Sequence, residues 1–230
     1  MSFLEIENLT KIYTVDHTAF VGVDNISLAI SRGEFLSIVG HSGSGKTTLL
    51  SLIGGILKPT SGRILLEGEE ISSFDDNRLS EFRATRIGFM FQFASLLPIL
   101  TAKENVLLPG IFTHELNKES GRTARDLLEM VGIGDKLNAY PSQLSGGQQR
   151  RVAIARALVN KPEIILADEP TGDLDEETEA EIMRLFEEIN KRQGVTILLI
   201  THNLELAGKA RKKIRMLRGR IVTLDPAEGS

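Results

Sequence analysis

The glycine-rich segment 40–47 constrains the possible folds of this chain more than any other stretch. It reads Gly-His-Ser-Gly-Ser-Gly-Lys-Thr, follows the apolar run 35–39 and precedes the helix-compatible segment 48–53. That order predicts a strand, a tight turn and a helix, and the pattern G-x-x-x-x-G-K-[ST] in this setting is typical of a phosphate-binding P-loop. Glycines let backbone N–H groups turn towards a phosphate, and the helix N-terminus adds a positive dipole end.

A nucleotide with Mg²⁺ is the ligand that this segment predicts. Lys46 would reach the β- and γ-phosphates, and the Thr47 hydroxyl would coordinate Mg²⁺. The alternative is a turn that only connects a strand to a helix, which the full match in the right context disfavours. The predicted nucleotide-binding residues of this segment are Gly40, His41, Ser42, Gly43, Ser44, Gly45, Lys46, Thr47 and Thr48.

Length and charge limit what the rest of the chain can be. Its 230 residues suffice for one large domain or a domain with a subdomain. The net charge of −4 provides no global basic field for nucleic acid, and the lack of cysteine excludes disulfides and thiolate metal sites. No apolar run approaches the ~18 residues that cross a bilayer, and the N-terminus lacks a secretory pattern. We therefore expect a cytoplasmic chain that reaches a membrane only through a partner.

Apolar runs alternate with helical patterns, which indicates an α/β fold. Residues 3–9 and 26–30 read as strands with a turn-like stretch between them. The runs 87–91, 164–167 and 195–200 are largely apolar, as buried parallel strands are. Ligands of open α/β sheets lie beyond the carboxyl ends of the strands, so the residues that follow these runs are candidates for a site.

Polar side chains follow each of these runs. Asp168 and Glu169 form an acidic pair that is costly unless a cation meets it. Mg²⁺ would meet Asp168, and Glu169 would then be free to orient or deprotonate water. Gln92 could touch Mg²⁺ or water, and His202 lies on the side expected for the γ-phosphate. Taken alone, however, Gln92 would be a surface glutamine and His202 a structural histidine.

Residues 93–140 differ from the rest in composition and pattern: a leucine- and proline-rich stretch is followed by helical patterns such as 122–131. We interpret the region of about 93–150 as a helical subdomain inserted in the α/β core. Its apolar residues Leu96, Leu97 and Ile99 are either subdomain core or a docking surface for a partner.

A second glycine-containing helix start follows at Ser145. This residue can cap the helix, and the two glycines after it expose the first N–H groups. The segment is either an ordinary capped helix or a second anion-binding helix terminus, and a single nucleotide needs only one.

Near the other end of the chain, the segment 209–220 carries seven basic residues and no acid. It reads as a hairpin with a solvated face, or as a contact for lipid headgroups or nucleic acid.

Together, the P-loop, Leu144-Ser145-Gly146-Gly147-Gln148 and the later Asp168-Glu169 pair resemble the nucleotide-binding subunits of ATP-binding cassette (ABC) ATPases. The resemblance spans about residues 3–224. It implies an α/β fold: a P-loop NTPase (RecA-like) core with an N-terminal antiparallel β subdomain and an inserted helical subdomain. Residues 1–230 would form one such domain, an ATPase that uses ATP and Mg²⁺.

The resemblance also implies roles for individual residues. The Tyr13 ring would stack on adenine, Gln92 would sense Mg²⁺, and Asp168 would be the metal-side carboxylate. Glu169 would be the catalytic base and His202 the switch histidine. The residues expected to serve a nucleotide across a head-to-tail, two-fold homodimer are Ser145, Gly146, Gly147, Gln148 and the D-loop residue Asp175.

Within the family, Phe91-Gln92, Leu96-Leu97-Pro98 and Thr171-Gly172-Asp173-Leu174-Asp175 resemble the branch of lipoprotein-release, macrolide-export and peptide-export ATPases. That branch implies an integral membrane permease as a separate partner, and a place on the inner face of the cell membrane. Asn203 departs from the family, where aspartate is frequent, and the tail is unusually basic. The alternatives are ABC ATPases that transport nothing: DNA-maintenance proteins, iron–sulfur assembly scaffolds, and cell-division or regulatory ATPases.

Overall fold

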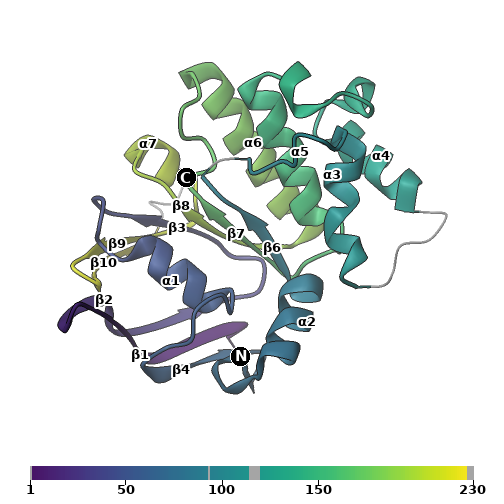
Figure 1. The fold of residues 1–230 in the computed structure, drawn as a ribbon. Coiled ribbons are helices and arrows are strands. Elements are labelled where there is room, and N and C mark those ends of the chain that lie inside the picture. The colour runs from purple at the N-terminus through teal and green to yellow at the C-terminus, as the bar shows by residue number, and fades with distance from the viewer. Residues whose placement is uncertain (1, 93, 114–119, 227–230) are drawn as a thin grey trace.

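The computed structural model describes residues 2–92, 94–113 and 120–226. Within these residues, the central sheet has six strands in the order β10-β9-β3-β8-β7-β6 (Figure 1). All neighbouring strands run parallel except β10, which is antiparallel to β9. The strands are β3 (Phe35–Val39), β6 (Ile87–Met90), β7 (Ile164–Asp168), β8 (Thr196–Ile200), β9 (Lys212–Leu217) and β10 (Arg220–Pro226). Their parallel order brings the carboxyl ends of β3, β6, β7 and β8 to one edge.

An antiparallel sheet in the order β2-β1-β4-β5 lies beside the central sheet. Its strands are β1 (Leu4–Val15), β2 (Thr18–Ile30), β4 (Ser61–Leu66) and β5 (Glu69–Glu70). The prediction of a turn-like stretch between residues 3–9 and 26–30 is wrong. Strands β1 and β2 continue through it to a tight bend at Asp16 and His17, both with positive φ. Side chains near this bend are exposed, so the buried pattern that predicts a strand is missing there.

Two helices cover opposite faces of the central sheet. Helix α1 (Lys46–Ile53) lies between the two sheets, where Leu49 and Leu52 share a buried cluster with residues of β1 and β4 (Figure 1). Helix α6 (Glu176–Gln193) covers the other face. Burial on both faces explains the apolar strands. The shorter helices are α2 (Asp76–Arg86), which contacts β6, and α7 (Leu204–Ala207), which contacts β3.

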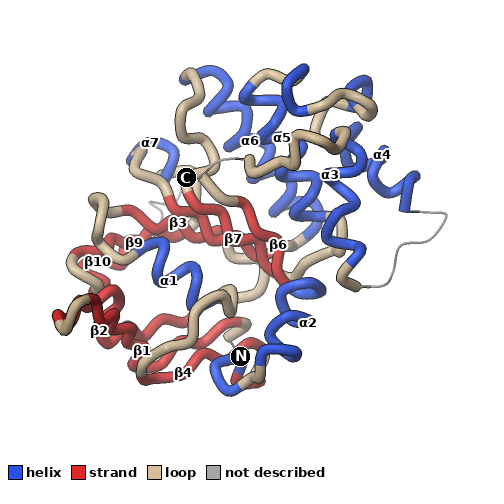
Figure 2. The backbone as a smooth tube through the Cα atoms, viewed as in Figure 1, coloured by secondary structure: helices blue, strands red, loops and turns tan. Residues whose placement is uncertain are grey.

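The described residues between β6 and β7 form helices joined by loops and contain no strand. They form α3 (Ala102–Leu107), α4 (Ser120–Met130), α5 (Gly146–Leu158) and the 3₁₀ turns Leu108–Ile111, Gly134–Lys136 and Pro141–Gln143. Figure 2 shows these helices gathered apart from the antiparallel sheet. The predicted helix at 122–131 is confirmed. The limits of about 93–150 stay a prediction, and residues 93 and 114–119 lie outside the described residues.

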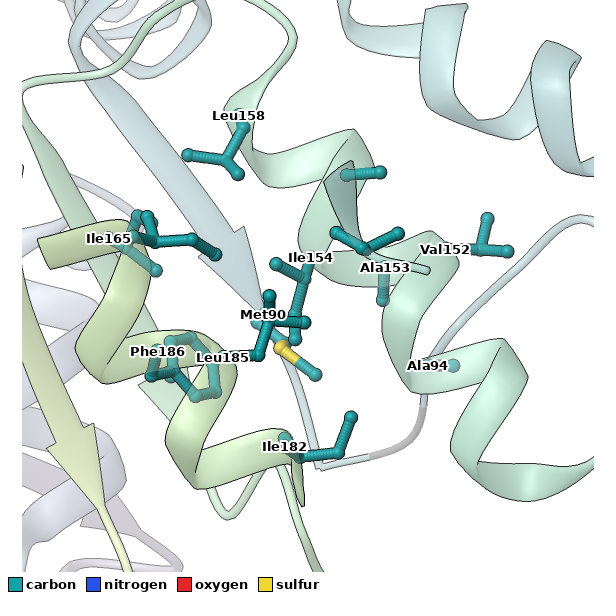
Figure 3. Packing of buried hydrophobic residues seen from close by; sticks show 14 of the residues in the cluster. Met90, Ala94, Val152, Ala153, Ile154, Leu158, Ile165, Ile182, Leu185 and Phe186 are labelled. Carbon is teal, nitrogen blue, oxygen red and sulfur yellow. The ribbon is translucent and has the colours of Figure 1, made fainter. Parts of the chain in front are cut away.

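The helical segment and the central sheet share one apolar core (Figure 3). Met90 at the end of β6 packs beside Ile154 of α5, with Ile182 and Phe186 of α6 nearby. All four are essentially inaccessible to solvent. Helix α5 is therefore held against β6 and α6 by packing. Among the described residues, no helix is long and apolar enough to cross a membrane.

Asn105 of α3 shapes the irregular stretch before that helix. It is completely buried, and its amide nitrogen donates to the carbonyls of Leu97, Leu100 and Thr101. Its amide oxygen accepts from the Leu97 N–H at 2.8 Å. One side chain therefore satisfies four backbone groups, while Leu97 and Ile99 themselves remain exposed.

Asn105→Ala should lower the free energy of unfolding by about 3 kcal/mol, because buried carbonyls lose their donor and a cavity forms. Urea denaturation of the full chain measures this. The control Asn138→Ala, at an exposed position, should stay within about 0.5 kcal/mol of wild type. Equal stability of the two variants would contradict the structural role of Asn105.

Candidate functional site

A pocket of about 900 Å³ lies at the carboxyl edge of the central sheet. All nine residues predicted in the P-loop segment line it, from Gly40 to Thr48. Gln92 after β6, Asp168 and Glu169 at the end of β7, and His202 after β8 complete one wall. The structure therefore brings together four separately predicted groups of residues.

The P-loop backbone forms a cradle at the start of α1. Gly45 precedes this helix with φ +98°, and a Cβ there would lie 2.1 Å from the Gly22 carbonyl oxygen. Only glycine fits this position. No side chain caps the helix, so its first N–H groups are available to a ligand. Ser44 Oγ is buried without a hydrogen-bond partner among the described residues. An anion would satisfy these donors.

Lys46 places its ammonium inside this cradle. Its side chain is 7% exposed, and Nζ donates to the carbonyls of Gly40 at 2.8 Å and His41 at 3.1 Å. A nearly buried cation whose hydrogen-bond acceptors, among the described residues, are neutral carbonyls favours a bound anion. The lysine is thus oriented for phosphate before any ligand arrives.

Thr47 and Asp168 form the pair that could hold a metal. The Thr47 hydroxyl donates to Asp168 Oδ2 at 2.8 Å. Burial raises the pKa of Asp168, and nearby Glu169 adds to this, while the Thr47 hydrogen bond and Lys46 oppose it. No cluster of three acidic, histidine or cysteine ligands exists among residues 2–92, 94–113 and 120–226. One carboxylate with a hydroxyl suits Mg²⁺ that is shared with phosphates, which supply its other ligands.

Glu169 and His202 face one another across the pocket wall. His202 Nδ1 lies 3.4 Å from Glu169 Oε2, and the Glu169 side chain is 24% exposed while that of His202 is 69% exposed. Glu169 has a positive φ of 45°, which is uncommon for a residue with a side chain. Surrounding contacts must hold such a conformation, and strain of this kind concentrates at functional sites.

Several predicted nucleotide-binding residues lie outside this pocket. Ser145 caps α5 by accepting from the Gln148 N–H, and the Gln148 side chain accepts from the Ser145 N–H in return. Asp175 caps α6 by accepting from the Thr178 N–H and hydroxyl. The nucleotide roles of Ser145, Gly146, Gly147, Gln148 and Asp175 stay predictions.

Tyr13 adjoins the edge of the pocket. Its hydroxyl lies 3.4 Å from Thr48 Oγ1 in the first turn of α1. A Cβ on Gly22, which lines the pocket, would meet the Tyr13 ring at 2.8 Å. The ring is therefore beside the P-loop, while its stacking on adenine stays a prediction.

Lys213 and Arg215 also line the pocket, and neither was predicted from the sequence to do so. They lie on β9 and line it together with Leu204 and Thr223. Strand β9 pairs in parallel with β3, so Arg215 lies opposite Val39, directly before the P-loop. The basic run 209–220 was the signal, but only the strand order shows where it lies. Its predicted hairpin is confirmed by the β9–β10 pairing.

Comparison with known proteins assigns the family. Residues 23–172 match the family described as ABC transporter. The chain is 42% identical over 221 residues to the lipoprotein-releasing system ATP-binding protein LolD of Geobacter metallireducens, covering 96% of this chain and 98% of LolD. It is 44% identical over 218 residues to the macrolide export ATP-binding/permease protein MacB of Rhodopirellula baltica, covering 94% of this chain but 32% of MacB.

A solved structure agrees with these relatives. It is the dimeric post-hydrolysis state of the ATP-binding cassette MJ0796 bound to ADP and Pi, at 40% identity and a TM-score of 0.91, covering 99% of this chain and 100% of that chain. The chain therefore belongs to the ABC transporter family. The predicted fold class and the branch that includes lipoprotein release and macrolide export are both confirmed.

The raised pKa of Asp168 predicts that Asp168→Asn stabilises the nucleotide-free protein at alkaline pH. The folded state binds this proton more tightly than the unfolded chain does. The carboxyl therefore lowers wild-type stability as pH rises from the ordinary aspartate pKa through the raised one. The difference in the free energy of unfolding between Asp168→Asn and wild type should become smaller as the pH falls. Urea unfolding over a pH series tests this, and a less stable variant at alkaline pH would contradict it.

Proposed function

We propose that this pocket binds ATP with Mg²⁺ and hydrolyses it, and that the chain is the motor subunit of an ABC transporter. The observation that carries the proposal is the contact of Glu169 with His202 opposite a P-loop whose lysine is already oriented. A module that only binds nucleotide has no need of that pair. Lipoprotein release and macrolide export by the relatives favour a transporter over the non-transporting alternatives.

ATP binding rests on the cradle described above. Amide groups at the start of α1 and the Lys46 ammonium would receive the β- and γ-phosphates. Thr47, Asp168 and Gln92 would hold Mg²⁺, whose chemistry is to neutralise charge on the phosphate oxygens. Lys46 would remain beside the charge that develops during the reaction, so it needs no rearrangement.

The hydrolytic step needs an oriented water and a proton acceptor. Glu169 would hold a water in line with the γ-phosphate and accept its proton as oxygen attacks phosphorus. The bond from phosphorus to the bridging oxygen breaks, and the products are ADP and phosphate. His202 would hydrogen-bond the γ-phosphate oxygens and limit the orientation of Glu169. Most of the rate gain in such reactions comes from positioning and charge stabilisation.

A second copy of the chain completes the site. The Ser145 helix terminus lies outside the pocket of its own chain, and the start of a helix can bind an anion through its backbone N–H groups. In a two-fold dimer, each α5 N-terminus would meet the nucleotide in the partner's P-loop. The dimeric structure of MJ0796 supports this arrangement. Bound ATP would then hold the two subunits together, and its hydrolysis would let them separate.

A groove of about 500 Å³ on the outer side of β6 suits the membrane permease. Phe89 and Phe91 stack in it with ring centroids 5.6 Å apart, and Phe112 is 69% exposed at its border. Gln92 follows Phe91 directly and lines the nucleotide pocket. An apolar helix of the permease in this groove would contact Phe91, and Phe91 is bonded directly to Gln92 of the nucleotide pocket. It would also hold the subunit on the inner face of the membrane.

Glu169→Gln should lower ATP turnover by about 100-fold or more, because an amide cannot accept the proton from water. ATP affinity should stay near wild type, since Lys46 and the P-loop are unchanged. A phosphate-release assay and calorimetric ATP titration measure the two quantities. Turnover at the wild-type rate would remove Glu169 from the chemistry.

Phe112→Asp should abolish co-purification of the permease from detergent-solubilised membranes, because a charge would face an apolar helix. The matched control is Val222→Asp, which alters an exposed apolar residue on β10 at a distance from the groove. Both variants should keep the thermal unfolding midpoint of wild type. If Phe112→Asp still captured a polytopic partner, the groove would not be the docking site.

A further inference from the structure

Glu179 of α6 connects the two loops that carry the proposed catalytic pair. Its Oε1 accepts from the Thr171 hydroxyl at 2.8 Å, and its Oε2 accepts from the Asn203 amide nitrogen at 3.1 Å. Thr171 lies two residues after Glu169, and Asn203 directly follows His202. We call these two contacts the Glu179 bridge. Among the described residues, Glu179 has no ion-pair partner, so its carboxylate serves these two donors.

The orientation of the Asn203 amide is fixed independently of Glu179. Its oxygen accepts from the N–H groups of Glu205 at 3.0 Å and Leu206 at 3.3 Å, which caps α7. The amide nitrogen must therefore point away from the helix, and it meets Glu179. An aspartate at position 203 could cap α7 equally well, but its second oxygen would face a carboxylate.

The Thr171 end of the bridge anchors the strained loop after β7. Thr171 is 4% exposed, and the adjacent Gly172 N–H donates to the Glu169 carbonyl at 3.1 Å. This turn holds Glu169 in its positive-φ conformation. Since His202 and Glu169 are themselves 3.4 Å apart, the contacts close a ring: Glu169, Thr171, Glu179, Asn203, His202 and back.

We propose that Glu179 is a positioning residue: by accepting hydrogen bonds from the loop of Glu169 and from the loop of His202, it sets the distance between these two side chains. The inference rests on the proposed roles of Glu169 and His202. Glu179 lines no part of the nucleotide pocket, so it acts only through the two loops. Losing the bridge should lower kcat and leave ATP affinity unchanged, because the P-loop makes no contact with it.

A complementary swap tests the bridge in the purified full chain. In Glu179→Gln, a single oxygen remains to accept from two donors, Thr171 and Asn203, so the bridge keeps one acceptor contact in place of two. In Asn203→Asp, two carboxylates meet. Each single variant should lower kcat about ten-fold while KM for ATP stays within about two-fold. In the double variant, an amide nitrogen at 179 meets a carboxylate at 203, and kcat should recover to within about two-fold of wild type.

Glu188→Gln is the matched control, because it removes the same charge from an exposed position of the same helix. It should leave kcat at the wild-type value. Wild-type kcat in both single variants, or losses that multiply in the double variant, would overturn the bridge. A failure of the proposed function looks different: wild type would then hydrolyse no ATP, or Glu169→Gln would keep its turnover.

Discussion

The half-buried carboxylate of Asp168 sets the electrostatic requirement that the rest of the site meets. It lies beside Glu169 at the end of an apolar strand, where burial raises its pKa. Two adjacent acids in this place favour a cation, and Asp168 itself is met by the Thr47 hydroxyl and by the nearby charge of Lys46. A metal ion bound together with the nucleotide would place positive charge beside these acids. Substrate binding and relief of an unfavourable charge arrangement are thus the same event.

The helical segment is tied to this edge of the sheet by packing and by one buried cation. Helix α5 shares the core of β6 and α6, so the Ser145 terminus is fixed relative to the pocket of its own chain. Arg150 of α5, which is 6% exposed, donates to the Gly172 carbonyl at 3.0 Å. Arg150 therefore links α5 directly to the loop after Glu169. The groove beside Phe91 adds a second route, since Gln92 links it to the nucleotide.

Much of the site could be predicted from the sequence because its residues follow apolar strands. The parallel order of β3, β8, β7 and β6 then brings Lys46, Gln92, Asp168 and His202 together, as the positions after the strands implied. The positions of Lys213 and Arg215 could not be predicted, because they depend on the pairing of β9 with β3. The same limit applies to the Glu179 bridge, which joins residues from three segments. The exposed tip of the β1–β2 hairpin lacked a buried pattern, so its strands seemed shorter than they are.

The central claim is that two copies of the chain close around ATP, and that the α5 N-terminus of each copy binds the nucleotide held by the P-loop of the other. Light scattering of Glu169→Gln, with and without ATP and Mg²⁺, tests it most directly. The prediction is a monomer without nucleotide and a dimer with it, and a return to monomer when Gly146→Asp places a carboxylate at the phosphate-facing terminus of α5. A monomer under saturating ATP, with binding confirmed in the same sample, would contradict the claim.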